Sequence, residues 1–302
     1  MIDVSMKFNT LRTASAQGIL HASPETISKI RDGKVPKGNV LEVARAAGIL
    51  AGKNTSQLIV FCHPIPVDLI EIEFELEHDQ LRATAFTKTV WKTGIEVEAI
   101  TAVTVALLNA YDMLKPLDNQ MKISGIEVIG KRGGKSTFVD EFENPIRAAV
   151  LVISDSTFEG TRKDKSGQII KSYLSERGLE VPVYQVLPDN MEKISASVKS
   201  LADDEKMDLI ITTGGTGFGP KDMTPEATID LLEKQAPGIT EAIRKHGKER
   251  TPYAMLSREL AGTRGKSLII NLPGSSKGAQ ESLEALFPGL LHIYPMMRGG
   301  GH

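Results

Sequence analysis

The spacing of apolar residues changes midway along this 302-residue chain, and the change predicts two domains. In the first half, LIEIEFELEHDQLRATAFTKTVW (69–91) alternates apolar and polar residues, which is typical of strands with one face in water. The turn at 78–80 predicts an antiparallel hairpin. Apolar residues at helical spacing over 40–50 and in 96–115 predict helices, and 122–130 predicts another strand. The first half is therefore predicted to be α+β, an antiparallel sheet with helices on one face in a ferredoxin-like arrangement.

The second half alternates continuous apolar runs with helical segments. A continuous apolar run is typical of a strand that is buried on both faces. The predicted strands are 148–154, 181–188, 208–213 and 266–273, and the predicted helices are 165–178, 190–203, 227–235 and 278–293. This alternation predicts an α/β domain with a doubly wound, mostly parallel sheet. From the acidic, proline-broken stretch between the two patterns, we predict a domain at 1–140, a linker at 141–146 and a domain at 147–302.

Polar loops follow three predicted strands of the second half, at the sheet edge where α/β proteins bind ligands. They are SDSTFEGTRKD, TTGGTGFGPKDMTPEA and NLPGSSKG. Glycines in the second loop let several backbone N–H groups point at one anion, with threonine hydroxyls beside them. This glycine loop comprises Thr213, Gly214, Gly215, Thr216 and Gly217. Thr224 and Pro225 predict a helix start, with the threonine as N-cap.

Two aspartates belong to the same predicted edge. Asp222 lies just before the predicted helix start, and Asp189 follows the second strand in LPDN. Carboxylates at these positions are suited to hold Mg²⁺ or a substrate amine. Each loop by itself is also explained by ordinary turn residues, but three loops on one edge favour a ligand site.

Composition and charge narrow the function classes. A net charge of −2 gives no electrostatic reason for nucleic acid or an anionic membrane as the main partner. The one cysteine, Cys62, excludes intrachain disulfides and cysteine-rich metal sites and suits a reducing compartment. The first ten residues lack the apolar core of a signal peptide, and we expect no window to be long and apolar enough to span a membrane. We therefore expect a cytoplasmic protein.

The stretch IGKRGGKSTF (129–138) resembles a P-loop but lacks its spacing. A Walker motif has four residues between its first glycine and its Gly-Lys pair, whereas only Lys131, Arg132 and Gly133 separate Gly130 from Gly134. The residues that follow contain an early proline and no helical period, so they predict no helix N-terminus to face phosphates. We therefore do not predict a P-loop ATPase or GTPase.

Ionisable residues of the first half have a structural and a functional interpretation. His63 stands beside two prolines in FCHPIP, and a lone histidine is often structural. Glu96 and Glu98 begin an apolar helix, where acids suit the helix dipole. Asp112 and Lys115 share a helix face near its end, either as a surface pair worth less than about 1 kcal/mol or as an acid and a lysine beneath a substrate.

The second half resembles the MogA/MoaB family of molybdopterin adenylyltransferases in LVISDS, LPDN, TTGGTGFGPKDMTPEA, LSRELAG, LIINLPGSSKGAQESL and RGGGH. The resemblance implies a Mg²⁺-dependent reaction of ATP with molybdopterin that gives adenylyl-molybdopterin and pyrophosphate. It implies that Asp189 and Asp222 are catalytic and hold Mg²⁺. The implied phosphate contacts are the glycine loop, Ser275, Ser276 and Lys277. Phe218-Gly219-Pro220 replaces a proline-richer stretch of that family.

The first half resembles the MoaC family of cyclic pyranopterin monophosphate synthases in RTASAQG, the stretch from PETISK to NTSQLI, CHPIP, KTGIEVEAITAVTVALLNAYDMLK and GGKS. The resemblance implies conversion of a cyclised dihydro-GTP intermediate into cyclic pyranopterin monophosphate and pyrophosphate. It implies no cofactor and a hexamer with sites at dimer interfaces. It makes Asp112 the catalytic acid/base and Lys115 its partner. The other implied substrate contacts are Phe61, Cys62, His63, Glu96, Val97, Glu98, Lys37, Lys53, Lys131 and Lys135, with Arg12 as a further candidate for the triphosphate.

Two points of this resemblance concern charge. Asn39 stands where the family usually has aspartate, which removes one negative charge near Lys37. If Lys115 is buried among other cations, its pKa should be lowered, which would suit proton transfer at neutral pH.

We predict a bifunctional enzyme of molybdenum cofactor biosynthesis. Its expected partners are pterin and GTP-derived small molecules, other enzymes of the pathway and copies of itself, as a hexamer or trimer, with no nucleic acid and no membrane. In the alternative, the second domain is a non-catalytic molybdopterin-binding scaffold. A generic nucleotide-binding regulator is disfavoured by the charge balance and by the absence of a DNA-binding motif. The two implied reactions are not consecutive, so no channelling is implied.

Overall fold

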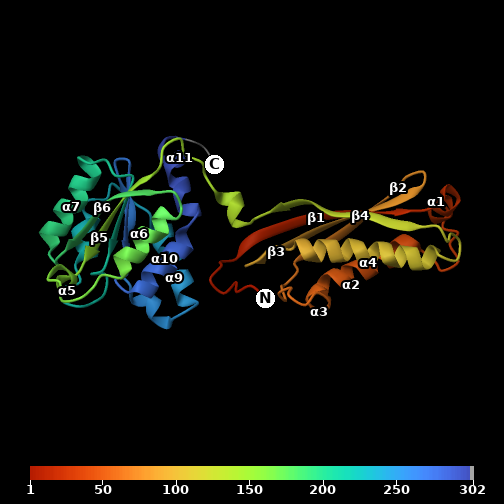
Figure 1. The fold of residues 1–302 in the computed structure, drawn as a ribbon, viewed down its shortest axis with the longest axis horizontal. Helices are drawn as coiled ribbons and strands as arrows, with labels where there is room; N and C mark the ends of the chain where they lie inside the picture. Colours follow the sequence, from red (N-terminus) through yellow and green to blue (C-terminus); the bar gives the residue numbers. More distant parts are fainter. Residues whose placement is uncertain (300–302) are drawn as a thin grey trace. The chain divides into compact units, whose positions relative to one another are not determined.

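The computed structural model describes residues 1–299, apart from the side chains of residues 135 and 136, and the chain divides into two units (Figure 1). The amino-terminal unit spans Met1–Phe138 and the carboxy-terminal unit spans Val139–His302. Each unit has its own buried core.

The amino-terminal unit is a four-stranded antiparallel sheet with helices (Figure 1). Its elements are β1 Thr10–His21, α1 Pro24–Arg31, α2 Val40–Lys53, α3 Thr55–Leu58, β2 Leu69–Leu76, β3 Gln80–Trp91, α4 Glu96–Leu114 and β4 Lys122–Arg132, followed by a 3₁₀ turn at Lys135–Phe138. The strand order β2-β3-β1-β4 is that of a ferredoxin-like sheet, so the predicted α+β fold is confirmed.

The strand β1 was not predicted, because three of its five buried residues are small. Ala14, Ala16 and Gly18 carry little hydropathy, although the strand alternates between buried and partly exposed positions. The helix α4 requires this smallness: a Cβ atom on Gly18 would lie 2.8 Å from Leu107 Cδ1 and 2.9 Å from Val103 Cγ1. The small size of these residues is explained by the close packing of α4 on the strand, and not by the strand's own pattern.

The helix α4 also corrects the expectation that no window is fit to cross a membrane. It is long and apolar enough by length and composition, with a mean hydropathy of 1.4. However, 56% of that window is buried inside the unit, where it packs on the sheet and on α2. A Cβ atom on Gly48 of α2 would lie 2.7 Å from the carbonyl oxygen of Ala102, so the two helices are in close contact. Its apolar composition is that of a core helix.

The carboxy-terminal unit is a three-layer α/β domain. Its elements are β5 Arg147–Ile153, α5 Asp155–Phe158, α6 Ser166–Ser175, β6 Glu180–Leu187, α7 Met191–Asp203, β7 Leu209–Thr213, α8 Thr224–Ile229, β8 Lys234–Gln235, α9 Pro237–Lys248, β9 Ala261–Arg264, β10 Ser267–Leu272, α10 Ser276–Leu286 and α11 Ile293–Met297. The strand order is β6-β5-β7-β10-β9-β8, and the first four strands are parallel. One core packs under α6, α9 and α10 and another under α7 and α8, which confirms the doubly wound prediction.

Four details of this unit correct the predictions. The helix predicted over 227–235 ends at Ile229, and Lys234–Gln235 forms the strand β8. The helix predicted over 278–293 ends at Leu286, because Phe287 precedes Pro288 and proline disfavours the α conformation in the residue before it. The helix α9 was not predicted. Thr224 is not an N-cap: it is the first residue of α8, and its buried hydroxyl donates to the carbonyl of Gly214 at 2.8 Å.

The residues predicted as a linker, 141–146, pack on the carboxy-terminal unit. The rings of Phe142 and Tyr294 meet edge to face, with centroids 6.1 Å apart, and Ile146 is buried. Just before them, a carboxylate oxygen of Asp140 lies 3.0 Å from Nδ1 of His292. These apolar and polar contacts place the segment with the second core.

Candidate functional site

In the amino-terminal unit, a carboxylate lies between two ammonium groups at the C-terminal end of α4. Asp112 Oδ1 is 2.7 Å from Lys115 Nζ, and Asp112 Oδ2 is 2.9 Å from Lys37 Nζ. Hydrogen bonds from Lys115 and then Lys37 lower the pKa of Asp112 to about 2. The same bond with Asp112 raises the pKa of Lys115. At neutral pH the group is therefore a carboxylate held by two ammonium ions.

The condition for a lowered pKa of Lys115 is not met in the chain by itself, where contact with Asp112 raises that pKa. Lys115 is 55% exposed and faces a carboxylate, whereas the expectation required burial among cations. Asn39 has a structural role that the sequence analysis did not include. Its side chain accepts a hydrogen bond from the N–H of Glu42 at 3.2 Å and caps α2, a task that asparagine and aspartate perform alike. Lys37 still reaches Asp112.

The opposite end of α4 holds the other predicted acids. Glu98 is 2% exposed, and burial raises the pKa of its carboxyl group. The thiol of Cys62 donates to Glu98 Oε1 at 3.4 Å, and burial and Glu98 raise the pKa of Cys62 to about 11. His63 follows Cys62 and is partly buried. The remaining predicted contacts near this end are Lys53, which ends α2, and the exposed side chains of Phe61 and Val97.

A cavity of about 200 Å³ adjoins the start of α4 and is lined by cations. Lys131 Nζ is 3.4 Å from Glu96 Oε1, and Arg132, which sequence analysis missed, lines the same cavity. Arg12 is buried, and its Nε has no hydrogen-bond partner among the described residues. The side chain of Lys135 lies outside the described part of the chain. This arrangement suits an anionic ligand, and it strengthens the case for Arg12.

The helix α4 separates the two groups of predicted residues. At about 1.5 Å per residue, Glu98 and Asp112 are roughly 20 Å apart along its axis. The helix α2 runs beside it, so that Lys37 lies near Asp112 while Gly52 packs against the backbone of Glu98. Within one chain, the residues of this predicted site therefore form two half-sites.

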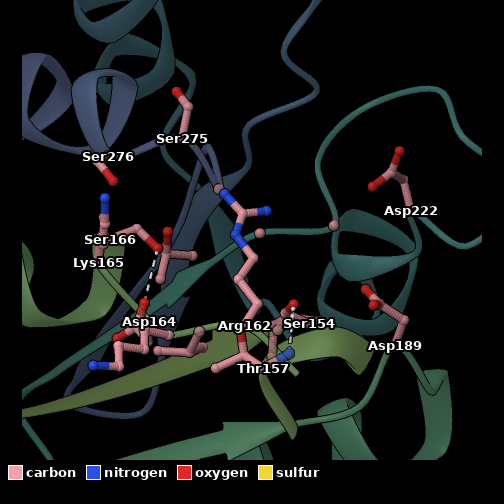
Figure 2. Close-up of a pocket in the computed structure, with 17 residues that line it drawn as sticks. Ser154, Thr157, Arg162, Asp164, Lys165, Ser166, Asp189, Asp222, Ser275 and Ser276 are labelled. Carbon is pink, nitrogen blue, oxygen red and sulfur yellow. Dashed lines mark hydrogen bonds between the residues drawn. The ribbon is translucent and has the colours of Figure 1, made fainter. Parts of the chain in front are cut away.

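In the carboxy-terminal unit, a pocket of about 350 Å³ opens at the C-terminal ends of the parallel strands (Figure 2). Its lining includes seven residues predicted from sequence, namely Thr213, Gly214, Gly215, Asp189, Asp222, Ser275 and Ser276. Three further predicted residues do not line it. Thr216 contacts the hydroxyl of Ser257 at 3.3 Å, the Gly217 carbonyl accepts from Arg258, and Lys277 is 81% exposed.

Asp189 and Asp222 lie on one side of this pocket, and Asp155, just outside the lining, is bonded to Asp189 (Figure 2). The N–H of Asp155 donates to Asp189 Oδ2 at 2.9 Å, and the N–H of Asp189 donates to Asp155 Oδ1 at 3.0 Å. Lys221 Nζ is 2.5 Å from Asp155 Oδ2. Burial, with smaller effects of the Asp155 and Asp222 charges, raises the pKa of Asp189. Concentrated negative charge of this kind favours a cation beside Asp189 and Asp222.

Sequence analysis missed the cations of the loop before α6. Arg162, Lys163 and Lys165 line the pocket together with Ser154 and Ser166 (Figure 2). Their loop, SDSTFEGTRKD, lies on the predicted edge, and its closely spaced cations were the signal that could have found them.

The backbone at Gly214 tolerates no side chain. Its φ is +105°, and a Cβ atom would lie 2.2 Å from the carbonyl oxygen of Ile153. We expect Gly214→Ala to lower the free energy of unfolding by more than about 1 kcal/mol and to distort the pocket. Gly238→Ala is the control, since nothing lies within 4 Å of its Cβ position. Thermal unfolding of both variants measures the difference, and equal stability would contradict the strain argument.

Comparison with known proteins agrees with this division. Residues 1–134 match the MoaC family, and residues 149–292 match a family described as "Probable molybdopterin binding domain". A cyclic pyranopterin monophosphate synthase from Clostridium perfringens (strain 13) is 50% identical over 138 residues, which cover 45% of this chain and 87% of that protein. The crystal structure of the molybdopterin biosynthesis enzyme MoaB from Thermus thermophilus is 45% identical and covers 51% of this chain and 97% of its own, with a TM-score of 0.49.

A further relative spans both units. The molybdenum cofactor biosynthesis bifunctional protein of Chlorobaculum tepidum is 41% identical over 302 residues, which cover all of this chain and 96% of that protein. Because the match is continuous through both units, the chain belongs to the family of bifunctional molybdenum cofactor biosynthesis proteins, with a MoaC domain followed by a domain of the MogA/MoaB type.

Proposed function

We propose that the amino-terminal unit converts a cyclised dihydro-GTP intermediate into cyclic pyranopterin monophosphate and pyrophosphate. The observation that carries the proposal is the Lys37–Asp112–Lys115 group, because it holds a proton donor and a proton acceptor in contact. Contact with Asp112 raises the pKa of Lys115 and so keeps its ammonium protonated, and Asp112 orients this proton donor. Arg12, Lys131 and Arg132 would bind the triphosphate in the cavity beside α4.

The two half-sites would be joined by a second copy of the chain. In a two-fold dimer each copy offers the same surface, so the Asp112 end of one copy can meet the Glu98 end of the other. This explains how residues roughly 20 Å apart in one chain can serve one substrate.

Complementation tests this shared site. Asp112→Asn and His63→Ala should each inactivate the unit alone, whereas co-expression should restore activity. Half of the randomly paired dimers are mixed, and one of their two sites is intact, so about a quarter of wild-type activity is expected. Cyclic pyranopterin monophosphate is quantified after mixed and single expression. If co-expression restores nothing, the half-sites do not meet as proposed.

We propose that the carboxy-terminal unit transfers the adenylyl group of ATP to molybdopterin. The pocket supports this proposal because backbone N–H groups, hydroxyls and cations face acids across one opening. Magnesium fits the acids: it is commonly held by one or two carboxylates together with substrate phosphates. No group of three or more histidine, cysteine or acidic side chains suited to a metal occurs among the described residues, so phosphates would complete the coordination. Asp189 and Asp222 would hold it, and when bound it would neutralise phosphate charge.

Incubation of the full chain with molybdopterin, ATP and Mg²⁺ tests the reaction. Adenylylated product and pyrophosphate, formed in equal amounts, are expected. Tight binding of molybdopterin without product would instead make this unit a non-catalytic binding module.

A further inference from the structure

In the pocket of the carboxy-terminal unit, Arg162, Lys163 and Lys165 form a positive wall, and no ion pair within the described part of the chain neutralises its charge. Among residues 1–299, no carboxylate forms an ion pair with Arg162, Lys163 or Lys165. Other cations around the pocket are paired: Lys221 contacts Asp155, and Arg258 contacts Glu226. Unpaired cations that share a pocket attract anions.

The backbone of this positive wall is held in place on its amino-terminal side. The chain reverses at Gly160, whose φ is +75°. The carbonyl of Ser156 then accepts three hydrogen bonds: from the N–H of Thr161 at 2.9 Å, from its hydroxyl at 2.8 Å and from the N–H of Arg162 at 3.0 Å. Arg162 therefore projects from an ordered turn, and in Figure 2 its guanidinium extends into the pocket. Because the backbone is already ordered, only the side chain of Arg162 has to be immobilised when it binds a ligand.

The carboxy-terminal side of the wall is held by Asp164. Its Oδ1 accepts from the N–H of Gly167 at 3.0 Å, and its Oδ2 accepts from the N–H of Gln168 at 3.2 Å and from the hydroxyl of Tyr184. Asp164, the acid within this run of cations, is thereby hydrogen-bonded to the N-terminal end of α6. It leaves the charge of Lys165 available to the pocket.

We propose that Arg162, with Lys165 as a second contact, binds the phosphates that leave as pyrophosphate. The guanidinium can bind two phosphate oxygens at once, and the ammonium adds a point charge. Because Asp189 and Asp222 lie elsewhere in the same pocket, the phosphate chain would run between the positive wall and the cation that these two acids would hold. The catalytic part of this inference rests on the proposed adenylyl transfer, whereas phosphate binding does not.

In that transfer, a phosphate oxygen of molybdopterin bonds to the α-phosphorus of ATP. The bond between the α-phosphorus and the oxygen that bridges to the β-phosphorus breaks, and its electron pair leaves with pyrophosphate. No oxidation or reduction occurs. Negative charge grows on the leaving oxygens, and a guanidinium beside them stabilises the transition state more than the ground state.

Binding of inorganic pyrophosphate with Mg²⁺ to the full chain, measured by calorimetry, tests the site without any turnover. We expect Arg162→Ala to weaken binding at least tenfold and Lys165→Ala to weaken it by a smaller factor. Lys266→Ala is the matched control, since Lys266 is exposed just before β10, at the opposite edge of the sheet. It should bind as the wild type does. Unchanged binding in Arg162→Ala, or no binding by the wild type, overturns the proposal.

Kinetics then separate a catalytic role from a simple binding role. At saturating ATP, Arg162→Ala should lower kcat about 100-fold or more, and Arg162→Lys should recover part of the loss. A raised KM with unchanged kcat overturns the catalytic part. If the wild type forms no adenylylated product but Arg162→Ala still loses pyrophosphate binding, the phosphate site stands and the proposed adenylyl transfer falls.

Discussion

Asp112→Asn is expected to abolish formation of cyclic pyranopterin monophosphate while leaving the fold intact. The substitution keeps the shape of the side chain but removes the charge that orients Lys37 and Lys115. A group that positions proton transfer typically contributes about 10²–10⁴-fold to the rate. The side chain is 55% exposed, so little packing is lost. Lys115→Ala should have an effect of similar size, because it removes the proposed proton donor.

Turnover and thermal unfolding are measured on the same preparations. Asp32→Asn is the matched control, because Asp32 also pairs with a lysine, Lys34, at 3.2 Å and is exposed on the same unit. It should turn over normally. Normal turnover in Asp112→Asn would remove the Lys37–Asp112–Lys115 group from the mechanism, whatever the state of the second unit.

Asp222→Ala is expected to block adenylylation of molybdopterin. Two effects combine in this variant. The carboxylate proposed to hold Mg²⁺ is lost, and so is the bond in which Asp222 Oδ2 accepts from the N–H of Gly219 at 2.7 Å. Removing charge stabilisation of this kind typically costs at least about 100-fold in rate. Asp222→Asn separates the effects, because it keeps an acceptor for Gly219 but removes the charge.

Product formation is followed over a range of Mg²⁺ concentrations. If the charge holds the metal, Asp222→Asn should be nearly as inactive as Asp222→Ala and should require more Mg²⁺. Full activity in Asp222→Asn would reduce Asp222 to an anchor of the loop. Asp230→Asn serves as control, since Asp230 is an exposed residue at the end of α8 in the same unit.

Local patterns were sufficient for much of the fold. The alternation in 69–91 predicted β2 and β3, because a strand with one face in water alternates apolar and polar residues. Apolar runs predicted β5, β7 and β10, because a strand buried on both faces is apolar throughout. The pattern failed at β1. There, Ala14, Ala16 and Gly18 take three of the five buried positions, and only the packing of α4 on them explains why.

For the candidate sites, sequence by itself determined the kinds of chemical group and the sheet edge that carries them. Glycine spacing, strand ends and helix starts are local features, so the sequence pattern was enough to assign Gly214, Asp189, Asp222 and Ser275 to one pocket.

Which groups meet became clear only from the folded chain. It brought Arg162 and Lys165 into the pocket of Ser275 and left Lys277 outside it. It also put Lys37 against Asp112 and the full length of α4 between that pair and Glu98. The reason is physical: position along the chain determines local conformation, whereas contact between distant residues depends on how whole helices and strands pack.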